Sequence, residues 1–267
     1  MLPRQAAPAP RRRWPSLLPL ILPIALLVAW QLSITLGLVE AYQLTPPLQV
    51  LESAIDMWNR GLLQSDILAT IWRVVAGFVI GAILAVILGT ITGLSRRTYE
   101  AVEPTLQAVR AIPSLAWAPL LLLWLGIGEA PKLTLVAIGA FFPVYVNLVA
   151  GIKGVDRKLV EVARIYNLGR AETARRVILP ASLPNLFTGL RLGFSQAWLF
   201  VVVAEIFGAT AGLGFRVTDS QLLTRVDLML VAMLVLAVLG KVSDTILLAI
   251  ERRALGWRDS IGIEASR

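Results

Sequence analysis

The sequence predicts an all-α membrane protein, a polytopic helix bundle with six transmembrane helices. Hydrophobic residues make up 57% of the 267 residues, charged residues only 16%, and the mean hydropathy is +0.75. A soluble core of this length cannot bury so much apolar surface. Six apolar runs each approach the roughly 20 residues that cross a hydrocarbon core, and Lys and Arg gather at their ends, where membrane orientation explains the basic pI better than nucleic-acid binding does.

The first apolar run, Ser16 to Leu38, directly follows a basic cluster that contains Arg11, Arg12 and Arg13. The run is longer than the apolar region of a signal peptide and ends without a small-residue cleavage site. We therefore expect a first transmembrane helix, preceded by a cytoplasmic tail over residues 1–15.

Five further runs complete the predicted transmembrane domain, residues 16–250. They are Ile67–Leu94, Leu106–Ile127, Leu133–Gly151, Leu186–Phe207 and Leu228–Ile250. Because each crossing reverses the side, both chain ends, the loop at Arg96 and the loop after Lys153 share one side, and these segments hold 17 of the 25 Lys and Arg residues. The positive-inside rule places that side in the cytoplasm, together with the C-terminal tail over residues 251–267.

A short helix is expected between the first two spans, with Thr45 as its cap and Pro46 and Pro47 in its first turn. Apolar residues then recur at helical spacing: Leu51, Ala54, Ile55, Trp58 and Leu62. This pattern is typical of an amphipathic helix that contacts membrane lipid on the outer face. Packing against the bundle's own extracytoplasmic loops fits it equally well.

Small residues repeat every four positions along the second span. They are Gly77, Gly81, Ala85, Gly89 and Gly93. This spacing lets two helix backbones approach closely. Packing within one subunit is the favoured interpretation, and a dimer contact is the alternative.

The third span is interrupted by Pro113 and Pro119. Each proline removes a backbone donor and disturbs the preceding turn, so the span either lines a cavity or simply kinks. Arg110 stands one turn before the first proline and could attract an anion. The candidate translocation residues are Arg110, Pro113, Ser114, Trp117, Asn147 and Glu205.

Charged residues inside apolar spans are costly and need partners or water. Arg73, Arg191 and Lys241 lie near span ends, and we expect them to extend toward water. Glu205 precedes a Gly-rich turn, and we expect it to hold an internal Arg or a backbone donor rather than cargo, because a carboxylate repels an anion.

A charged segment, Glu161 to Pro180, lies between two apolar runs. Asp156 can cap a helix with an apolar stripe of Leu159, Val162, Ala163 and Tyr166. Asn167 and Gly169 then favour a left-handed turn. A second short helix, 171–178, is expected to end at Leu179–Pro180, because proline disfavours helical backbone in the residue before it.

This hairpin resembles the EAA loop of ABC importer permeases. Glu161, Ala163, Leu179 and Pro180 fall in register with that pattern, and Asn167 stands where the family usually has Gly. The likeness extends from about Leu48 to Arg253, through blocks such as RVVAGFVIGAILAVILG and VVAEIFGATAGLG. These blocks are similar to permeases that import aliphatic sulfonates, taurine, nitrate, bicarbonate or thiamine-precursor pyrimidines.

The resemblance implies a type I ABC importer permease fold in a bacterial inner membrane, with residues 153–183 as the coupling loop. It implies a second permease copy, two cytoplasmic ATPase subunits that hold the ATP and Mg²⁺, and an extracytoplasmic binding protein. The coupling residues would be Glu161, Ala163, Arg164, Asn167, Gly169, Leu179 and Pro180. An aliphatic sulfonate is the preferred substrate on overall likeness alone.

Several other functions are excluded by residues that the sequence lacks. With no Cys, no His and no P-loop motif, the chain has no means of thiolate, His-metal, Ser-His or P-loop nucleotide chemistry. We therefore expect no enzyme activity, no metal site and no cofactor in this chain. An ion-coupled secondary transporter is the alternative class, although Glu205 is the only carboxylate available to it well inside a span.

Overall fold

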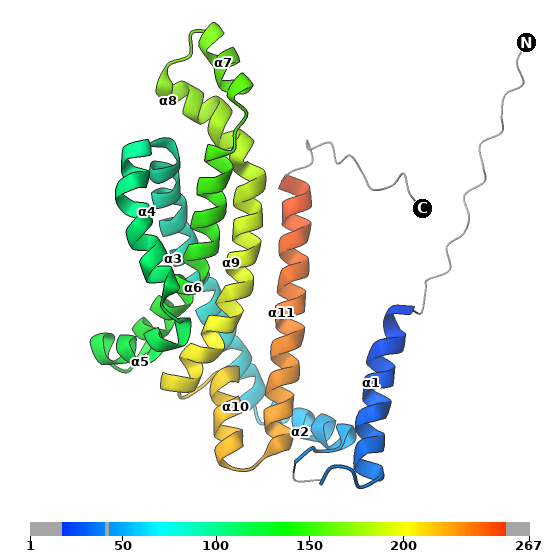
Figure 1. Ribbon diagram of the computed structural model, residues 1–267. Coiled ribbons are helices and arrows are strands. Elements are labelled where there is room, and N and C mark those ends of the chain that lie inside the picture. The colour runs from blue at the N-terminus through cyan, green and yellow to red at the C-terminus, as the bar shows by residue number, and fades with distance from the viewer. Residues whose placement is uncertain (1–17, 41–42, 255–267) are drawn as a thin grey trace, which may run out of the picture.

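The computed structural model describes residues 18–40 and 43–254, and these residues form helices and no β-strand (Figure 1). The membrane-sized elements and their neighbours in the first half are α1 (Leu18–Thr35), α2 (Pro47–Asn59), α3 (Leu62–Leu94), α4 (Arg96–Ala111), α5 (Ser114–Leu125) and α6 (Glu129–Lys153). The second half contains α7 (Arg157–Ile165), α8 (Arg170–Thr173), a π-helical turn η1 (Ala174–Ile178), α9 (Leu179–Gly208), α10 (Leu213–Leu222) and α11 (Val226–Ala254).

Four helical stretches in the described part of the chain are long and apolar enough to cross a membrane. They are Leu62–Leu94, Glu129–Lys153, Arg170–Gly208 and Val226–Ala254. The bent pair of α4 and α5 would count as a fifth span. The apolar part of α1 that is described, Ile21–Thr35, is shorter, and residues 1–15 and 255–267 of the predicted tails lie outside the described residues. The sixth span therefore stays a prediction.

Helix α6 packs between α3 and α9, and glycines bring the three backbones close together. A Cβ atom added to Gly77 would lie 2.6 Å from Cβ of Val136, and one added to Gly81 would collide with the carbonyl group of Ala137. On the other side of α6, a Cβ at Gly193 would lie 2.8 Å from the carbonyl oxygen of Ala140. The small-residue strip of α3 thus packs within the subunit, which confirms the favoured interpretation.

Helix α2 begins at Pro47 with Pro46 at its cap position, so the prediction that Thr45 caps it is wrong. The carbonyl oxygen of Thr45 instead accepts a hydrogen bond from the indole nitrogen of Trp30 at 3.1 Å. Val50 and Met57 of α2 are buried in a cluster with residues of α10 and α11. The predicted stripe largely faces away from the bundle, because Leu51, Ile55 and Trp58 are exposed and only Ala54 packs against the cluster.

The helix that starts at α8 runs without interruption through η1 into α9. The expected end at Leu179–Pro180 is therefore wrong, and Ile178 and Leu179 both keep helical backbone angles. The reason is the π-helical turn, in which the N–H of Leu179 bonds to the carbonyl of Ala174, five residues back. This change in hydrogen-bond spacing just before Pro180 lets the helix continue through a residue that has no backbone N–H to donate.

Candidate coupling hairpin and membrane cavity

The hairpin between α6 and α9 is capped at both ends of α7. The Asp156 carboxylate accepts a hydrogen bond from the N–H of Lys158 at 2.9 Å and starts the helix. At the other end, the N–H of Leu168 bonds to the carbonyl of Ala163 at 3.0 Å and the N–H of Asn167 to that of Arg164 at 2.9 Å. This is the Schellman pattern, which requires a left-handed residue directly after the helix.

Asn167 alone supplies that left-handed residue. Its φ angle is 56°, whereas Gly169 has φ −64° and an extended conformation at the start of α8. Gly169 therefore takes no part in the left-handed turn, which the sequence had assigned to either residue or to both. Asparagine tolerates this conformation because its short polar side chain can bond locally.

The hairpin projects beyond the end of the helix bundle and presents both charged and apolar side chains to its surroundings (Figure 1). Glu161 and Arg164 are exposed, and Ala163 is buried. The rest of the predicted apolar stripe is uncovered, with Val162 48% and Tyr166 76% exposed. Of the other predicted coupling residues, Leu179 is half-buried and Pro180 is exposed in the first turn of α9. An exposed apolar face on a charged helix is a surface suited to docking a partner.

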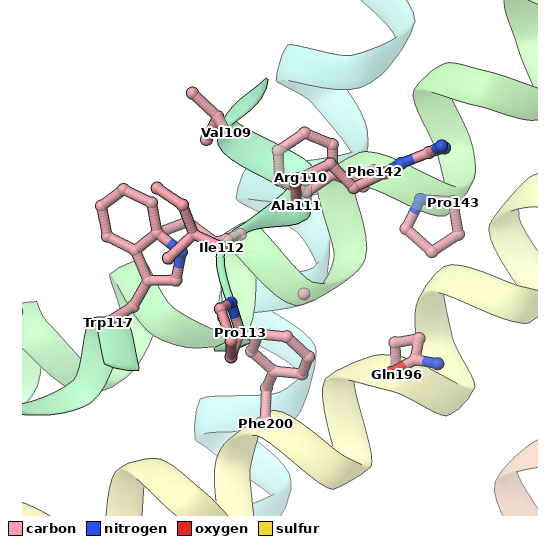
Figure 2. Close-up of a pocket in the computed structure, with 12 residues that line it drawn as sticks. Val109, Arg110, Ala111, Ile112, Pro113, Trp117, Phe142, Pro143, Gln196 and Phe200 are labelled. Atoms are coloured by element: carbon pink, nitrogen blue, oxygen red, sulfur yellow. The ribbon is translucent and has the colours of Figure 1, made fainter. Parts of the chain in front are cut away.

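A cavity of about 300 Å³ lies where α4 and α5 meet at 105°. Ile112 and Pro113 have extended backbone angles that separate the two helices. Figure 2 shows the side chains that surround the cavity, which come from the α4–α5 bend, from α6 and from α9. A more apolar groove of about 560 Å³ adjoins it along α3 and α6.

Three of the six candidate translocation residues line this cavity, namely Arg110, Pro113 and Trp117. Asn147 lies one turn away on α6, where its amide donates to the carbonyl of Pro143 at 2.8 Å. Ser114 starts α5, but its side chain lies outside the described part of the structure. Glu205 does not line the cavity either, and its place is described below.

Other lining residues were not predicted from the sequence. They include Phe142 on α6 and Gln196 and Phe200 on α9. The aromatic residues resemble any membrane-facing side chain in an apolar run. Gln196 could have been identified from the sequence, because an amide in the middle of the apolar run Leu186–Phe207 needs a polar environment.

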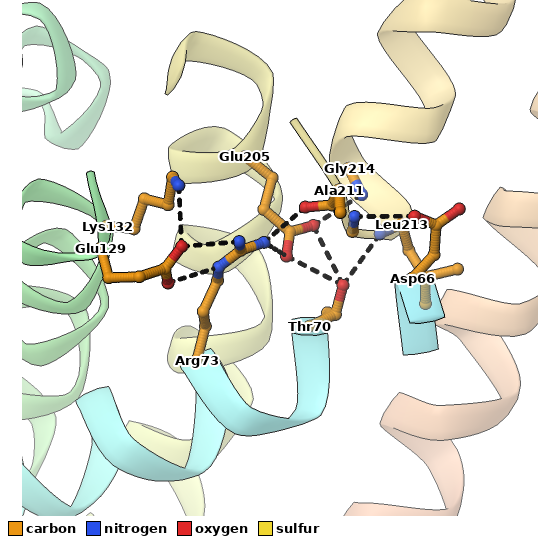
Figure 3. Close-up of polar contacts among 10 residues, drawn as sticks. Asp66, Thr70, Arg73, Glu129, Lys132, Glu205, Ala211, Leu213 and Gly214 are labelled. Atoms are coloured by element: carbon orange, nitrogen blue, oxygen red, sulfur yellow. Dashed lines mark hydrogen bonds and ion pairs between the residues drawn. The ribbon is translucent and has the colours of Figure 1, made fainter. Parts of the chain in front are cut away.

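Glu205 lies in a buried ionic cluster at the end of the bundle opposite the hairpin (Figures 1 and 3). Its side chain is fully buried and lies 2.8 Å from a guanidinium nitrogen of Arg73. It also accepts hydrogen bonds from the hydroxyl of Thr70 at 2.9 Å and the N–H of Gly214 at 2.7 Å. Glu205 thus holds an internal Arg and a backbone donor, as expected.

Arg73 does not extend toward water, so that prediction is wrong. Only 6% of its side chain is exposed, and its guanidinium also binds Glu129 at 2.8 Å and the carbonyl of Ala211 at 2.6 Å. Glu129 and Glu205 are distant in sequence, but α6 and α9 bring both carboxylates to one arginine. By contrast, Arg191 pairs with Asp244 of α11 at 2.8 Å with 39% of its side chain exposed.

The same cluster fixes the turn between α9 and α10. The N–H of Gly212 bonds to the buried carboxylate of Asp66 at 2.9 Å, and the N–H of Leu213 bonds to the hydroxyl of Thr70 at 2.8 Å. Arg216 neutralises Asp66 at 2.8 Å. Gly212 has φ 125°, and a Cβ at this position would collide with the carboxylate of Glu205, so only glycine fits.

The chain is similar to known proteins over most of its length. The chain is 38% identical over 250 residues to the aliphatic sulfonates transport permease protein SsuC of Bacillus subtilis (strain 168), covering 94% of this chain and 91% of that one. It is 31% identical over 258 residues to the taurine transport system permease protein TauC of Escherichia coli (strain K12), covering 93% and 94%.

A solved structure shares the fold. A chain of the MetNI methionine ABC transporter, in an inward facing conformation, superposes with a TM-score of 0.64 at 20% identity. The match covers 74% of this chain and 96% of that one. The described helices therefore have the type I ABC importer permease fold.

Residues 77–256 match the sequence profile of the binding-protein-dependent transport system inner membrane component family. This chain belongs to that family, as an ABC importer permease of the type that includes the sulfonate, taurine and nitrate permeases.

Proposed function

We propose that this chain is the membrane subunit of an ATP-driven importer that takes up a small organic anion, with an aliphatic sulfonate as the best assignment. Two copies would form the translocation pathway, an extracytoplasmic binding protein would deliver the anion, and two ATPase subunits would bind ATP and Mg²⁺ at the cytoplasmic face. The sulfonate assignment is supported by the relatives, one of which is named for aliphatic sulfonates and another for taurine.

The observation that carries this proposal is the hairpin. It projects from the bundle end, is fixed by caps at both ends of α7, and leaves Val162, Ile165 and Tyr166 uncovered beside the exposed Glu161. Because α8 is continuous with the membrane-crossing α9, a partner that moves the hairpin would move that span as a rigid body. Glu161 would make the polar contact with the ATPase, and Tyr166 and its apolar neighbours would fill a groove.

This assignment also orients the chain. If the hairpin is cytoplasmic, the end of the bundle that carries α2 and α10 is extracytoplasmic (Figure 1). Helix α11 ends at the hairpin side, so the C-terminal tail would be cytoplasmic. The binding protein would then approach the face that holds α2 and α10.

The ionic cluster argues against an ion-coupled secondary transporter. Such a carrier needs an intramembrane carboxylate that exchanges partners with a proton or sodium ion. Within residues 18–40 and 43–254, the buried carboxylates Asp66, Glu205 and Asp227 each pair with an arginine. A carboxylate that already has an arginine as its partner is not free to bind a transported ion.

The function is tested in proteoliposomes that contain the permease and its two ATPase subunits, with the binding protein outside. We expect uptake of radiolabelled ethanesulfonate to require internal ATP and to continue when ion gradients are collapsed. Glu161→Lys should assemble normally but lose most of the ATPase stimulation by the loaded binding protein. Glu100→Lys is the matched control, since Glu100 is an exposed carboxylate of α4 outside the hairpin. Uptake that follows an ion gradient without ATP would overturn the proposal.

A further inference from the structure

The cavity at the α4–α5 bend is lined by two polar side chains and three aromatic rings. Arg110 comes from the last turn of α4, and Gln196 comes from α9 on the opposite side (Figure 2). The rings of Phe142, Phe200 and Trp117 complete the lining, and no Asp or Glu is among its residues. The cavity therefore combines a positive charge, an amide and an apolar surface in one half-open space.

Arg110 and Gln196 have no hydrogen-bond or ion-pair partner among the described residues of this chain. Arg73 and Arg191, which lie well inside long membrane-crossing helices, both have carboxylate partners at 2.8 Å. An unpaired guanidinium between membrane-crossing helices is costly unless it meets water or an anion. Arg110 is exposed in the last turn of α4, so its guanidinium is accessible to water or to an anion beside the bend.

The two polar groups suit an oxyanion of the sulfonate type. A guanidinium presents a rigid fork of N–H donors that can engage two oxygens at once, and an amide adds further donors. A sulfonate has three oxygens on one sulfur, so Arg110 and Gln196 can bind different oxygens of the same head group from opposite walls.

The three aromatic rings are suited to contact the apolar tail of an organic sulfonate. Phe200 lies directly against the backbone of Gly139, where an added Cβ would be 2.5 Å from the ring. This contact fixes the position of the ring and limits the depth of the cavity. At about 300 Å³, the space is at the lower end of the range for small-molecule sites, roughly 300–1,000 Å³. An inorganic oxyanion has no apolar part, so it would make no contact of this kind with the aromatic rings.

We propose that this cavity is a membrane binding site for the transported anion, in which Arg110 and Gln196 hold the oxyanion head and the aromatic residues hold a short apolar tail. The permease itself then selects organic sulfonates over inorganic anions, in addition to any selection by the binding protein. This inference rests on the proposed function, because it assumes that anions pass through this bundle.

The test uses the permease–ATPase complex in lipid nanodiscs without binding protein, with radiolabelled ethanesulfonate as the probe. We expect saturable binding that falls at least about tenfold in affinity in Arg110→Gln and in Gln196→Leu, which each remove donors to a charged ligand. Arg97→Gln is the matched control, because Arg97 is an exposed arginine at the other end of α4. Nitrate and sulfate should compete at least about tenfold more weakly than propanesulfonate.

Arg110→Lys is used if Arg110→Gln does not assemble. It keeps the positive charge but loses the paired N–H donors of the guanidinium, so it should weaken ethanesulfonate binding by a smaller factor than Arg110→Gln. Phe200→Ala should deepen the cavity and raise the uptake of hexanesulfonate relative to ethanesulfonate by at least about threefold. Unchanged binding in both Arg110→Gln and Gln196→Leu, or equal competition by nitrate, would overturn the inference. ATP-driven uptake by a complex with no binding in the nanodisc assay would also overturn it, while the proposed function would stand.

Discussion

The guanidinium of Arg73 lies 2.8 Å from the carboxylate of Glu205, and their side chains are only 6% and 0% exposed. Arg73 belongs to α3 and Glu205 to α9, and the other edge of the same guanidinium binds Glu129 at the start of α6. One arginine therefore joins the three closely packed helices at the end of the bundle opposite the hairpin. Removing it would leave a buried carboxylate without a counter-charge.

The first prediction concerns this pair. Arg73→Met should lower the free energy of unfolding by about 3–5 kcal/mol, because it removes the counter-charge of the buried carboxyl group of Glu205. Arg73→Met combined with Glu205→Leu should cost clearly less than the sum of the single changes. Thermal unfolding in detergent, followed by tryptophan fluorescence, measures both. Arg96→Ala, which breaks the exposed Arg96–Glu100 pair, should cost less than about 1 kcal/mol. A loss in Arg73→Met as small as that control would contradict the prediction.

The second prediction compares two glycines within long helices. Gly81→Ala should destabilise the fold by about 1–3 kcal/mol, because the new methyl group collides with the backbone carbonyl of Ala137. Gly240→Ala should be neutral or stabilise α11 by up to about 1 kcal/mol, since nothing lies within 4 Å of the added Cβ. The same unfolding assay separates them, and equal effects at the two positions would refute the close packing of α3 on α6.

The third prediction concerns the end of α7. Asn167→Gly should keep the hairpin, whereas Asn167→Val should cost about 1–2 kcal/mol locally, because a β-branched residue is strained at φ 56°. We expect faster limited proteolysis of the hairpin and weaker ATPase stimulation in the valine variant. Gly169→Ala is the control, since its φ of −64° suits alanine and its Cβ direction is open. Equal protease sensitivity of the two Asn167 variants would count against the Schellman cap.

The fourth prediction uses the absence of native cysteine. Gln196→Cys should react with a hydrophilic thiol reagent, and the rate should depend on whether the partner ATPases hold nucleotide. Ala197→Cys is the neighbouring control and should remain unreactive, because Ala197 is fully buried against α3 and α6. Equal labelling of the two cysteines would show that the cavity wall on α9 is placed incorrectly.

Local patterns predicted much of this structure. The glycine strip of α3 could be read from its four-residue spacing, and the turn at Asn167 from the few residues that tolerate left-handed backbone. The partner type of Glu205 followed from charge alone, because a carboxylate in an apolar run needs a cation or a donor. The family resemblance then placed these features in one fold.

Features that depend on distant residues could not be predicted in the same way. Arg73 looked like a span-end arginine because its partners lie 56 and 132 residues further along the chain. Pro180 looked like a helix end, since the π-helical turn that accommodates it has no strong sequence signal. Gln196 could be recognised as unusual, but its position opposite Arg110 depends on the bend between α4 and α5.

The contact of glycine with backbone on both sides of α6 limits how this protein can move. Helices that touch through main-chain atoms cannot slide past one another without steric overlap. We therefore expect α3, α6 and α9 to move as one rigid unit. The hairpin connects α6 and α9, which both belong to this unit. A displacement of the hairpin would therefore move the two helices together rather than change the angle between them. We therefore expect any gating motion to occur at the borders of this unit, where the bent α4–α5 segment and α11 meet it.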